Sequence, residues 1–192
     1  KIRNLISNNR ETFEDPFVIE PQIFRDDRGL FFESWNQEKF NDLFPNNIIF
    51  LQDNHSFSKK NVLRGLHYQL PPYPQAKLVR CTFGKIFDVI VDIRFNSDTY
   101  GKWISVELNG NNHKQIWIPE GFAHGFLVLS DFAIVEYKTT NLWFKNLERT
   151  IRWDDNEIAI DWPILDTKKL HLSDKDANGQ SLKNARLKKE IF

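Results

Sequence analysis

The 192-residue sequence contains only one cysteine, Cys81, so it cannot form an internal disulfide bond. Proteins without disulfides are typical of reducing compartments, and we expect a cytoplasmic protein. No run of apolar residues approaches the roughly 18 positions that a membrane-spanning helix needs, and we expect no membrane partner. Lysine plus arginine and aspartate plus glutamate both number 26, so no overall charge attracts nucleic acid. A local cluster of cations must therefore bind any anionic ligand.

Long helical patterns are scarce as well, and most of the sequence reads as short strands separated by turns. Only residues 36–44 have helical spacing, with Asn36 as the N-cap and Pro45 after the end. We expect strands at residues 17–24, 30–35, 48–55, 62–68, 77–83, 86–94, 102–108, 114–118, 125–129 and 132–139. This pattern predicts an antiparallel sandwich or barrel in a single domain, residues 1–192. We expect the polar tail from Asn178 onward to be loosely held.

Charged and titratable residues stand among strand-forming residues in two neighbouring segments. Residues 62–69 read Val-Leu-Arg-Gly-Leu-His-Tyr-Gln, and residues 75–80 read Gln-Ala-Lys-Leu-Val-Arg. Burying such groups is costly unless they have a use, so we interpret these segments as the floor of an active site. The proline-rich turn between them, residues 71–74, either covers the mouth of a pocket or is a plain surface turn.

The period of two in a strand indicates which side chains share an inward face. It places Lys77 and Tyr137 on the inward faces of their strands. Arg64 and His67 are three positions apart, so their side chains point to opposite faces of a regular strand. Both can line one cavity only if the strand bends, which is easiest at Gly65. Each residue also has a structural interpretation, because a strand histidine is often a core residue and a strand-end lysine usually reaches solvent.

A second histidine, His124, lies within residues 118–126, at the end of another strand, and raises the question of a metal site. The spacing Pro-x-Gly-x-x-His at residues 119–124 resembles the second metal motif of the cupins, a superfamily of small barrels. However, the segment His-Tyr-Gln at residues 67–69 lacks the second histidine of their first motif, and the ammonium group of Lys77 would repel a cation. We therefore expect a site without a metal.

Without a metal, a histidine base, a lysine cation and a tyrosine phenol remain, and this set suits proton abstraction next to a carbonyl group. Such a carbon acid is too weak for a neutral imidazole unless the enolate oxygen is stabilised as it forms, which the ammonium of Lys77 would do. If His67 removes the proton from one face and Tyr137 returns one to the other face, the carbon is epimerised.

On these residues the sequence resembles the dTDP-4-dehydrorhamnose 3,5-epimerases, cupin-fold enzymes of nucleotide-sugar metabolism. The resemblance extends from about residue 17 to residue 176. It is carried by segments at residues 27–34, 52–56, 63–69, 77–80, 87–94, 117–126, 137–140 and 172–176. It implies a mainly β protein, a cupin-type antiparallel jelly-roll barrel with a few short helices, that forms a homodimer and needs no cofactor.

The resemblance also implies a role for each residue of the site. His67 is the general base, Asp176 orients it, Lys77 stabilises the enolate at C4, and Tyr137 donates the proton. The substrate is dTDP-4-dehydro-6-deoxy-D-glucose, inverted at C3 and C5 to give dTDP-4-dehydro-L-rhamnose. Besides Lys77, the residues implied to contact this nucleotide sugar are Arg28, Glu33, Gln52, Asp53, Asn54, Arg64, His124, Trp143, Glu148 and Lys175.

One position departs from the family pattern, because Trp143 stands where the family usually has a tyrosine that stacks on thymine. An indole keeps the stacking face, but the preference for thymine over other bases is then open. Three alternatives to the 3,5-epimerase hypothesis are also open. The first is an enzyme that inverts one carbon or moves the ketone of a related sugar, the second a cupin that binds nucleotide sugars without catalysis, and the third a metal-dependent cupin.

Overall fold

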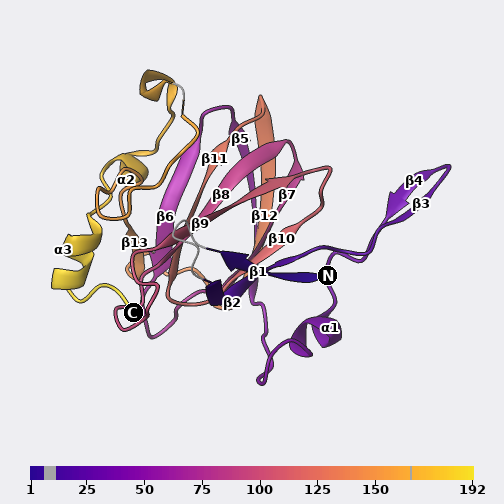
Figure 1. Ribbon diagram of the computed structural model, residues 1–192, viewed down its shortest axis with the longest axis horizontal. Coiled ribbons are helices and arrows are strands. Elements are labelled where there is room, and N and C mark those ends of the chain that lie inside the picture. The colour runs from indigo at the N-terminus through magenta and orange to yellow at the C-terminus, as the bar shows by residue number, and fades with distance from the viewer. Residues whose placement is uncertain (7–11, 165) are drawn as a thin grey trace.

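The protein consists mainly of antiparallel strands, which form two large sheets and one small hairpin (Figure 1). The computed structural model describes residues 1–6, 12–164 and 166–192. One sheet has the order β1 (Ile2–Ile6), β2 (Thr12–Ile19), β10 (Gln115–Ile118), β7 (Lys77–Phe83), β12 (Phe132–Thr139) and β5 (Gln52–Lys59). The other has the order β13 (Glu148–Thr150), β6 (Leu63–Gln69), β11 (Phe122–Val128), β8 (Lys85–Asp92) and β9 (Trp103–Asn109). The predicted fold class, a mainly β jelly roll, is confirmed.

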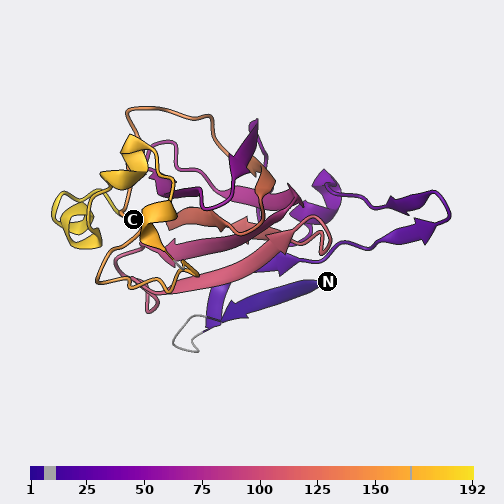
Figure 2. The same ribbon diagram turned by 90° about the horizontal axis from the view of Figure 1, so that it is seen from above.

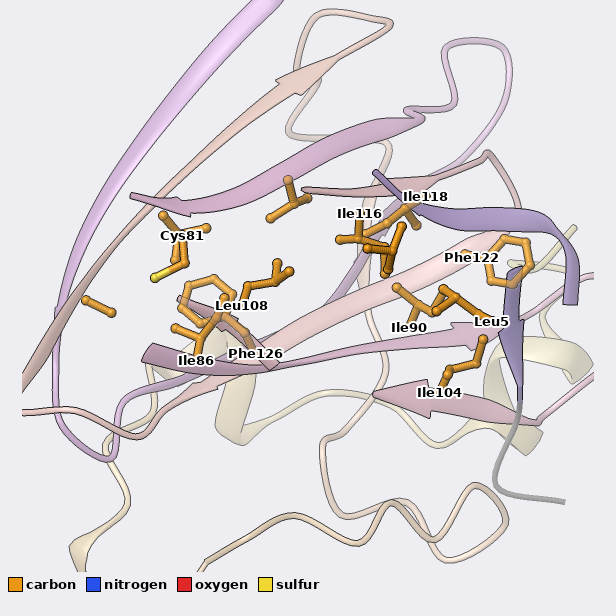
Figure 3. Close-up of a cluster of buried hydrophobic side chains, with 14 of the residues drawn as sticks. Leu5, Cys81, Ile86, Ile90, Ile104, Leu108, Ile116, Ile118, Phe122 and Phe126 are labelled. Atoms are coloured by element: carbon orange, nitrogen blue, oxygen red, sulfur yellow. The ribbon is translucent and has the colours of Figure 1, made fainter. Parts of the chain in front are cut away.

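The main core lies between these two sheets, and β8 shows how the sequence builds it. Ile86 and Ile90 point into a cluster with Ile116 of the opposite sheet (Figure 3). Val89 and Val91 point to the other face of the same strand, into a second apolar cluster. Because side chains alternate along a strand, β8 has to be apolar on both faces. Its interruption by a buried Asp88 is therefore a feature to be explained.

The second apolar cluster is covered by the C-terminal segment, which contains a short 3-10 helix (Thr167–Lys169), α2 (Asp174–Ala177) and α3 (Leu182–Leu187). The expectation of a loosely held tail is wrong, since Leu182 and Ala185 of α3 are fully buried. Short helices separated by loops leave no long periodic pattern, so the sequence did not reveal them. None of the helices in the described part of the chain has the length and apolarity that crossing a membrane requires.

A hairpin of β3 (Phe24–Asp26) and β4 (Gly29–Phe31) projects away from the two sheets (Figure 2). It is followed by α1 (Gln37–Asn41), whose predicted N-cap is confirmed because the side chain of Asn36 accepts a hydrogen bond from the backbone of Lys39. The strand predicted at residues 30–35 is shorter than expected, and every residue of β3 and β4 is exposed. The described part of the chain therefore leaves both faces of the hairpin exposed.

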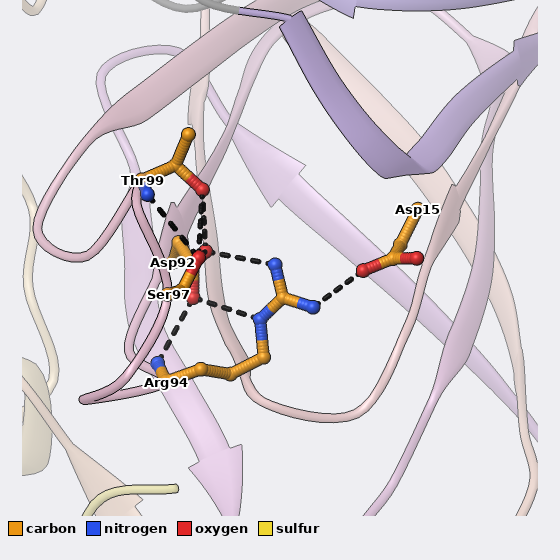
Figure 4. A network of polar contacts seen from close by, with 5 residues as sticks. All are labelled: Asp15, Asp92, Arg94, Ser97 and Thr99. Atoms are coloured by element: carbon orange, nitrogen blue, oxygen red, sulfur yellow. Dashed lines mark hydrogen bonds and ion pairs between the residues drawn. The ribbon is translucent and has the colours of Figure 1, made fainter.

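A network of polar contacts joins the end of β8 to β2 of the other sheet (Figure 4). The carboxylate of Asp92 is buried and accepts hydrogen bonds from Arg94, Ser97 and Thr99. Burial alone would raise its pKa, but these hydrogen bonds outweigh burial and hold the pKa below its usual range. Arg94 also pairs with Asp15 of β2. The network therefore fastens the two sheets together at one end of the barrel.

Candidate active site

His67, near the end of β6, forms a tight pair with Asp176 of α2. The distance from His67 Nε2 to Asp176 Oδ1 is 2.5 Å, and Asp176 is 3% exposed. The hydroxyl of Ser173 donates to the second carboxylate oxygen at 2.7 Å, and the backbone N–H of Gly65 donates to the first at 3.3 Å. Ser173 is also the N-cap of α2, where its oxygen accepts the N–H of Asp176. The start of one short helix thus fixes the carboxylate against the imidazole.

These contacts determine the charges of the pair. Burial would raise the pKa of Asp176, but the hydrogen bonds from His67, Ser173 and Gly65 outweigh it and lower the pKa, so the carboxylate is ionised. Burial lowers the pKa of His67 despite the neighbouring carboxylate, so the imidazole is neutral near pH 7. A carboxylate can only accept, so Nε2 carries the hydrogen and Nδ1 carries the lone pair. Nδ1 is therefore the atom that can take up a proton.

Lys77, at the start of β7, brings a cation next to His67 from the opposite sheet. Its Nζ donates to the backbone oxygen of His67 at 3.2 Å, and the residue is 7% exposed. Burial lowers the pKa of the ammonium group to about 8, while the carboxylates of Glu148 and Asp88 act in the other direction. Lys77 is thus a buried cation at neutral pH, but its pKa lies only slightly above neutral pH, so it loses its proton in mildly alkaline solution.

Tyr137 of β12 supplies the phenol. Burial raises the pKa of its hydroxyl; the nearby carboxylate of Glu148 raises it further, and the guanidinium of Arg64 acts against both. The phenol therefore keeps its proton at neutral pH and can donate it to a stronger base.

His67, Lys77 and Tyr137 line one cavity of about 340 Å³. The structure brings eight of the predicted site residues to its wall: Gln52, Asn54, His67, Lys77, Tyr137, Trp143, Glu148 and Lys175. Asp176 stands behind His67. Three further wall residues were missed, Tyr68, Gln69 and Gln75. Gln69 lies two positions after His67, and Gln75 lies two positions before Lys77. The period of two in a strand could therefore have identified both.

Five predicted site residues are not part of this wall. Arg28 and Glu33 lie in and after the projecting hairpin, where Arg28 pairs with Asp26 and Glu33 with Lys39. Asp53 pairs with Lys138 at 2.8 Å beside a neighbouring pocket on β5.

Arg64 donates from Nε to Ser58 at 3.0 Å, and His124 forms a hydrogen bond with Asp88. Of Arg64 and His67, only His67 lines the cavity, although the register of β6 against β11 shifts between them, next to Gly65.

His124 lies directly across the β6–β11 pair from His67 and has a carboxylate partner of its own. Its Nε2 is 2.9 Å from Oδ2 of Asp88, and both residues are buried. This pair explains why an aspartate interrupts the apolar β8. Among the described residues, no three histidine, cysteine, aspartate or glutamate side chains converge as a metal ligand set would. The absence of a metal stays a prediction.

The family model for dTDP-4-dehydrorhamnose 3,5-epimerase matches residues 10–184. The dTDP-4-dehydrorhamnose 3,5-epimerase of Escherichia coli (strain K12) is 55% identical over 167 residues, which are 87% of this chain and 89% of the relative. A crystal structure of the dTDP-6-deoxy-D-glucose-3,5-epimerase of Legionella pneumophila, in complex with dTDP-4-keto-L-rhamnose, is similar with a TM-score of 0.89 and 41% identity, covering 100% of this chain and 97% of that chain.

A structure with a different named activity is also similar. The 3'-monoepimerase of Streptomyces bikiniensis, in complex with dTDP-quinovose, has a TM-score of 0.85 and 31% identity, covering 92% of this chain and 88% of that chain. The fold is therefore shared by proteins named as double and as single epimerases. The higher identities belong to the relatives named as double epimerases.

Proposed function

Because the chain belongs to the dTDP-4-dehydrorhamnose 3,5-epimerase family and is thus an epimerase of the isomerase class, we propose that His67, Lys77 and Tyr137 invert C3 and C5 of a dTDP-4-keto-6-deoxy sugar. The observation that supports this best is the shared cavity, where a neutral imidazole, a buried ammonium and a protonated phenol meet. The substrate is dTDP-4-dehydro-6-deoxy-D-glucose and the product is dTDP-4-dehydro-L-rhamnose.

In the first step, Nδ1 of His67 takes the proton from the carbon next to the C4 ketone. The electron pair of the broken C–H bond moves into the ring, and the ketone oxygen becomes an enolate. The ammonium of Lys77, which is 7% exposed, stabilises this negative charge, and such an interaction is stronger at a buried group than in water. Asp176 stabilises the imidazolium that His67 becomes.

In the second step, the hydroxyl of Tyr137 gives a proton to the opposite face of the same carbon. The carbon regains one hydrogen with inverted configuration, and the sugar keeps its composition. Tyr137 is left as a phenolate and His67 as an imidazolium. Exchange of one proton with solvent at each residue restores the starting state, so the cycle consumes no co-reactant and requires no cofactor.

The nucleotide end of the substrate would lie against Trp143 and Lys175 of the cavity wall. Trp143 is half exposed and offers a ring face on which a base can stack. Lys175 supplies positive charge for the diphosphate next to the enolate-stabilising Lys77, and Glu148 pairs with Lys175 at 2.8 Å. A neutral protein thereby provides the local cation cluster that an anionic substrate needs. The bound nucleotide sugar in the Legionella pneumophila enzyme supports this assignment.

A homodimer would explain why Arg28 and Glu33 lie away from the cavity of their own chain. The projecting hairpin exposes Phe24 and Phe31 together with the Arg28 guanidinium. In a dimer, these aromatic rings would be buried against a second copy, and Arg28 would reach that copy's nucleotide sugar. The two sheets and the C-terminal cover then form one domain per subunit, in a protein that works in the cytoplasm.

Incubation with dTDP-4-dehydro-6-deoxy-D-glucose in deuterated water tests the proposal. We expect the product to carry deuterium at C3 and at C5. Label at one carbon alone would instead identify a single epimerase like the similar enzyme of Streptomyces bikiniensis. Absence of both label and conversion would leave a protein that binds nucleotide sugars without catalysis.

A further inference from the structure

Gln69, the last residue of β6, is a buried amide for which the proposed reaction has no use. It is 2% exposed and lies two positions after His67, on the same strand. Its Nε2 donates to the backbone oxygens of Tyr73 at 2.5 Å and of Leu142 at 3.0 Å. Its Oε1 accepts the backbone N–H of Phe144 at 2.8 Å. One side chain therefore holds two separate loops by their backbones.

The two loops form the rim of the cavity. The first, residues 71–75, ends at the cavity residue Gln75, and the second, residues 140–147, carries the cavity residue Trp143. The loops also touch each other through the rings of Tyr73 and Phe144, which stack at 4.7 Å between centroids with an angle of 25°. The proline-rich turn at residues 71–74 thus packs against the loop that carries Trp143, but none of its residues lines the cavity, so both interpretations of its sequence stay open.

Trp143 is held by its backbone from both directions. Its own N–H donates to Oε1 of Gln52 at 2.9 Å, and the next N–H along the chain, that of Phe144, donates to Gln69. The indole itself is half exposed, so packing covers only part of it. The two backbone hydrogen bonds fix the backbone at Trp143 and thereby limit where the ring face can lie.

Only a carboxamide can make the three contacts of Gln69. Two carbonyl oxygens need two donors from one end of the side chain, and one N–H needs an acceptor at the other end. A glutamate of the same shape would place a carboxylate oxygen against two carbonyl oxygens, and a leucine would leave all three backbone groups without this partner. The position is therefore specific for glutamine on chemical grounds.

We propose that Gln69 is a positioning residue that sets the geometry of the nucleotide subsite through Trp143, without contact to the reacting carbons. This inference rests on the proposed function, since it assigns the nucleotide end of the substrate to the rim. It predicts that loss of the amide weakens nucleotide binding and leaves the proton transfers intact. The separation of these two effects distinguishes a positioning role from a general structural one.

The test compares Gln69→Leu and Gln69→Glu with Gln180→Leu as a matched control. Gln180 is also a partly buried amide, but it donates to Glu190 in the C-terminal segment and is not part of the cavity wall. For the Gln69 variants we expect the dissociation constant of dTDP, measured by calorimetry, to rise about tenfold. At saturating substrate, kcat should stay within about threefold of the wild type. The control should change neither quantity.

A fluorescence measurement on the ligand-free protein tests the same inference without any turnover. The contribution of Trp143 is obtained by subtracting the spectrum of the same variant carrying Trp143→Phe. We expect acrylamide to quench Trp143 more strongly in both Gln69 variants than in the wild type. If Gln69→Leu fails to fold, Gln69→Glu retains the size of the side chain and carries the test.

Wild-type quenching together with an unchanged dissociation constant for dTDP would overturn the inference. A fall in kcat with unchanged dTDP binding would overturn it as well, since it would assign Gln69 to the chemistry. Failure of the wild type to convert the 4-keto sugar would refute the proposed function instead, and the quenching of Trp143 would still report on Gln69.

Discussion

The ring of His67 has one nitrogen committed to Asp176, and this arrangement decides which nitrogen is basic. The ionised carboxylate accepts from Nε2, so the lone pair remains on Nδ1. An amide in place of the carboxylate can turn its NH2 group toward Nε2 and thereby move the imidazole hydrogen to Nδ1. The carboxylate therefore determines the tautomer as well as the stability of the imidazolium.

We expect Asp176→Asn to lower kcat by about 100-fold or more, because the imidazole then presents the wrong tautomer. Steady-state kinetics with the 4-keto sugar would measure this loss. Asp174→Asn is the matched control, since Asp174 lies exposed in the same helix. Activity of Asp176→Asn equal to that of the control would refute the role given to the pair.

The ammonium of Lys77 predicts the alkaline limit of activity. Burial lowers its pKa to about 8, and only the protonated form can stabilise the enolate. We therefore expect kcat to fall as pH rises through this value, and a pH–rate profile would show it. Toward acid pH, the lowered pKa of His67 should keep activity constant at pH values below the usual pKa of a histidine. An alkaline limb that persists in Lys77→Arg at the same pH would contradict the assignment.

The buried ammonium of Lys77 should also make the stability of the protein depend on pH, with stability rising where activity falls. Its pKa is 10.5 in the unfolded reference state and about 8 in the folded protein, so between these values the unfolded chain binds more protons. The contribution of Lys77 to stability therefore rises with pH across this window, while activity falls. We expect Lys77→Met to raise the melting temperature at pH 7 and to lower kcat by about 100-fold or more. A lower melting temperature would show that the buried charge is well compensated.

Among the elements, most strands of the barrel could be predicted from sequence, and the C-terminal cover could not. The sequence did not reveal β1 and β13, and the strands predicted at residues 17–24 and 48–55 overlap β2 and β5 only in part. The alternation of Ile86, Asp88 and Ile90 with Phe87 and Val89 identifies β8 and both of its faces. The short helices α2 and α3 offer no such period. Their one local signal is a serine just before each helix, at Ser173 and Ser181, and both serines are N-caps.

Burial of α3 predicts a large loss of stability from one truncation in the cover. Leu182 is 0% exposed, so Leu182→Ala should lower the free energy of unfolding by about 2–5 kcal/mol. Leu187→Ala in the same helix is the control, because Leu187 is 71% exposed and its loss should cost little. Chemical denaturation of both variants would measure the difference. Equal stabilities would mean that α3 is not docked on the sheet.

The candidate site was only partly predictable, for physical reasons that differ between residues. The strand period placed Lys77 and Tyr137 inward, because parity follows from local geometry. The path of the chain near Gly65, and hence the positions of Arg64 and His67, depends on a register shift that sequence does not encode locally. Arg28 lies on the hairpin of β3 and β4, which the described part of the chain leaves exposed, so only the proposed dimer would bring it to a site.

For the whole molecule, the proposed exchange of the hairpin between subunits can be tested by mixing two inactive variants. In a heterodimer of Arg28→Ala and His67→Asn, one site combines the intact His67 of the first chain with the intact Arg28 of the second. We expect such mixtures to regain roughly one quarter of wild-type activity after subunit exchange, since half of the random dimers are mixed and each has one intact site. Without exchange of the hairpin, every site keeps a defect and the mixture stays inactive.

The central claim is that two side chains move protons on opposite faces of one carbon, and exchange of substrate hydrogen in deuterated water measures it most directly. The wild type should incorporate deuterium at C3 and C5 with inversion. Tyr137→Phe should still incorporate deuterium, because His67 can return a solvent-derived deuteron to the face from which it took the proton, but without inversion. His67→Asn should incorporate none. Inversion at the wild-type rate in Tyr137→Phe, or exchange that persists in His67→Asn, would contradict the account.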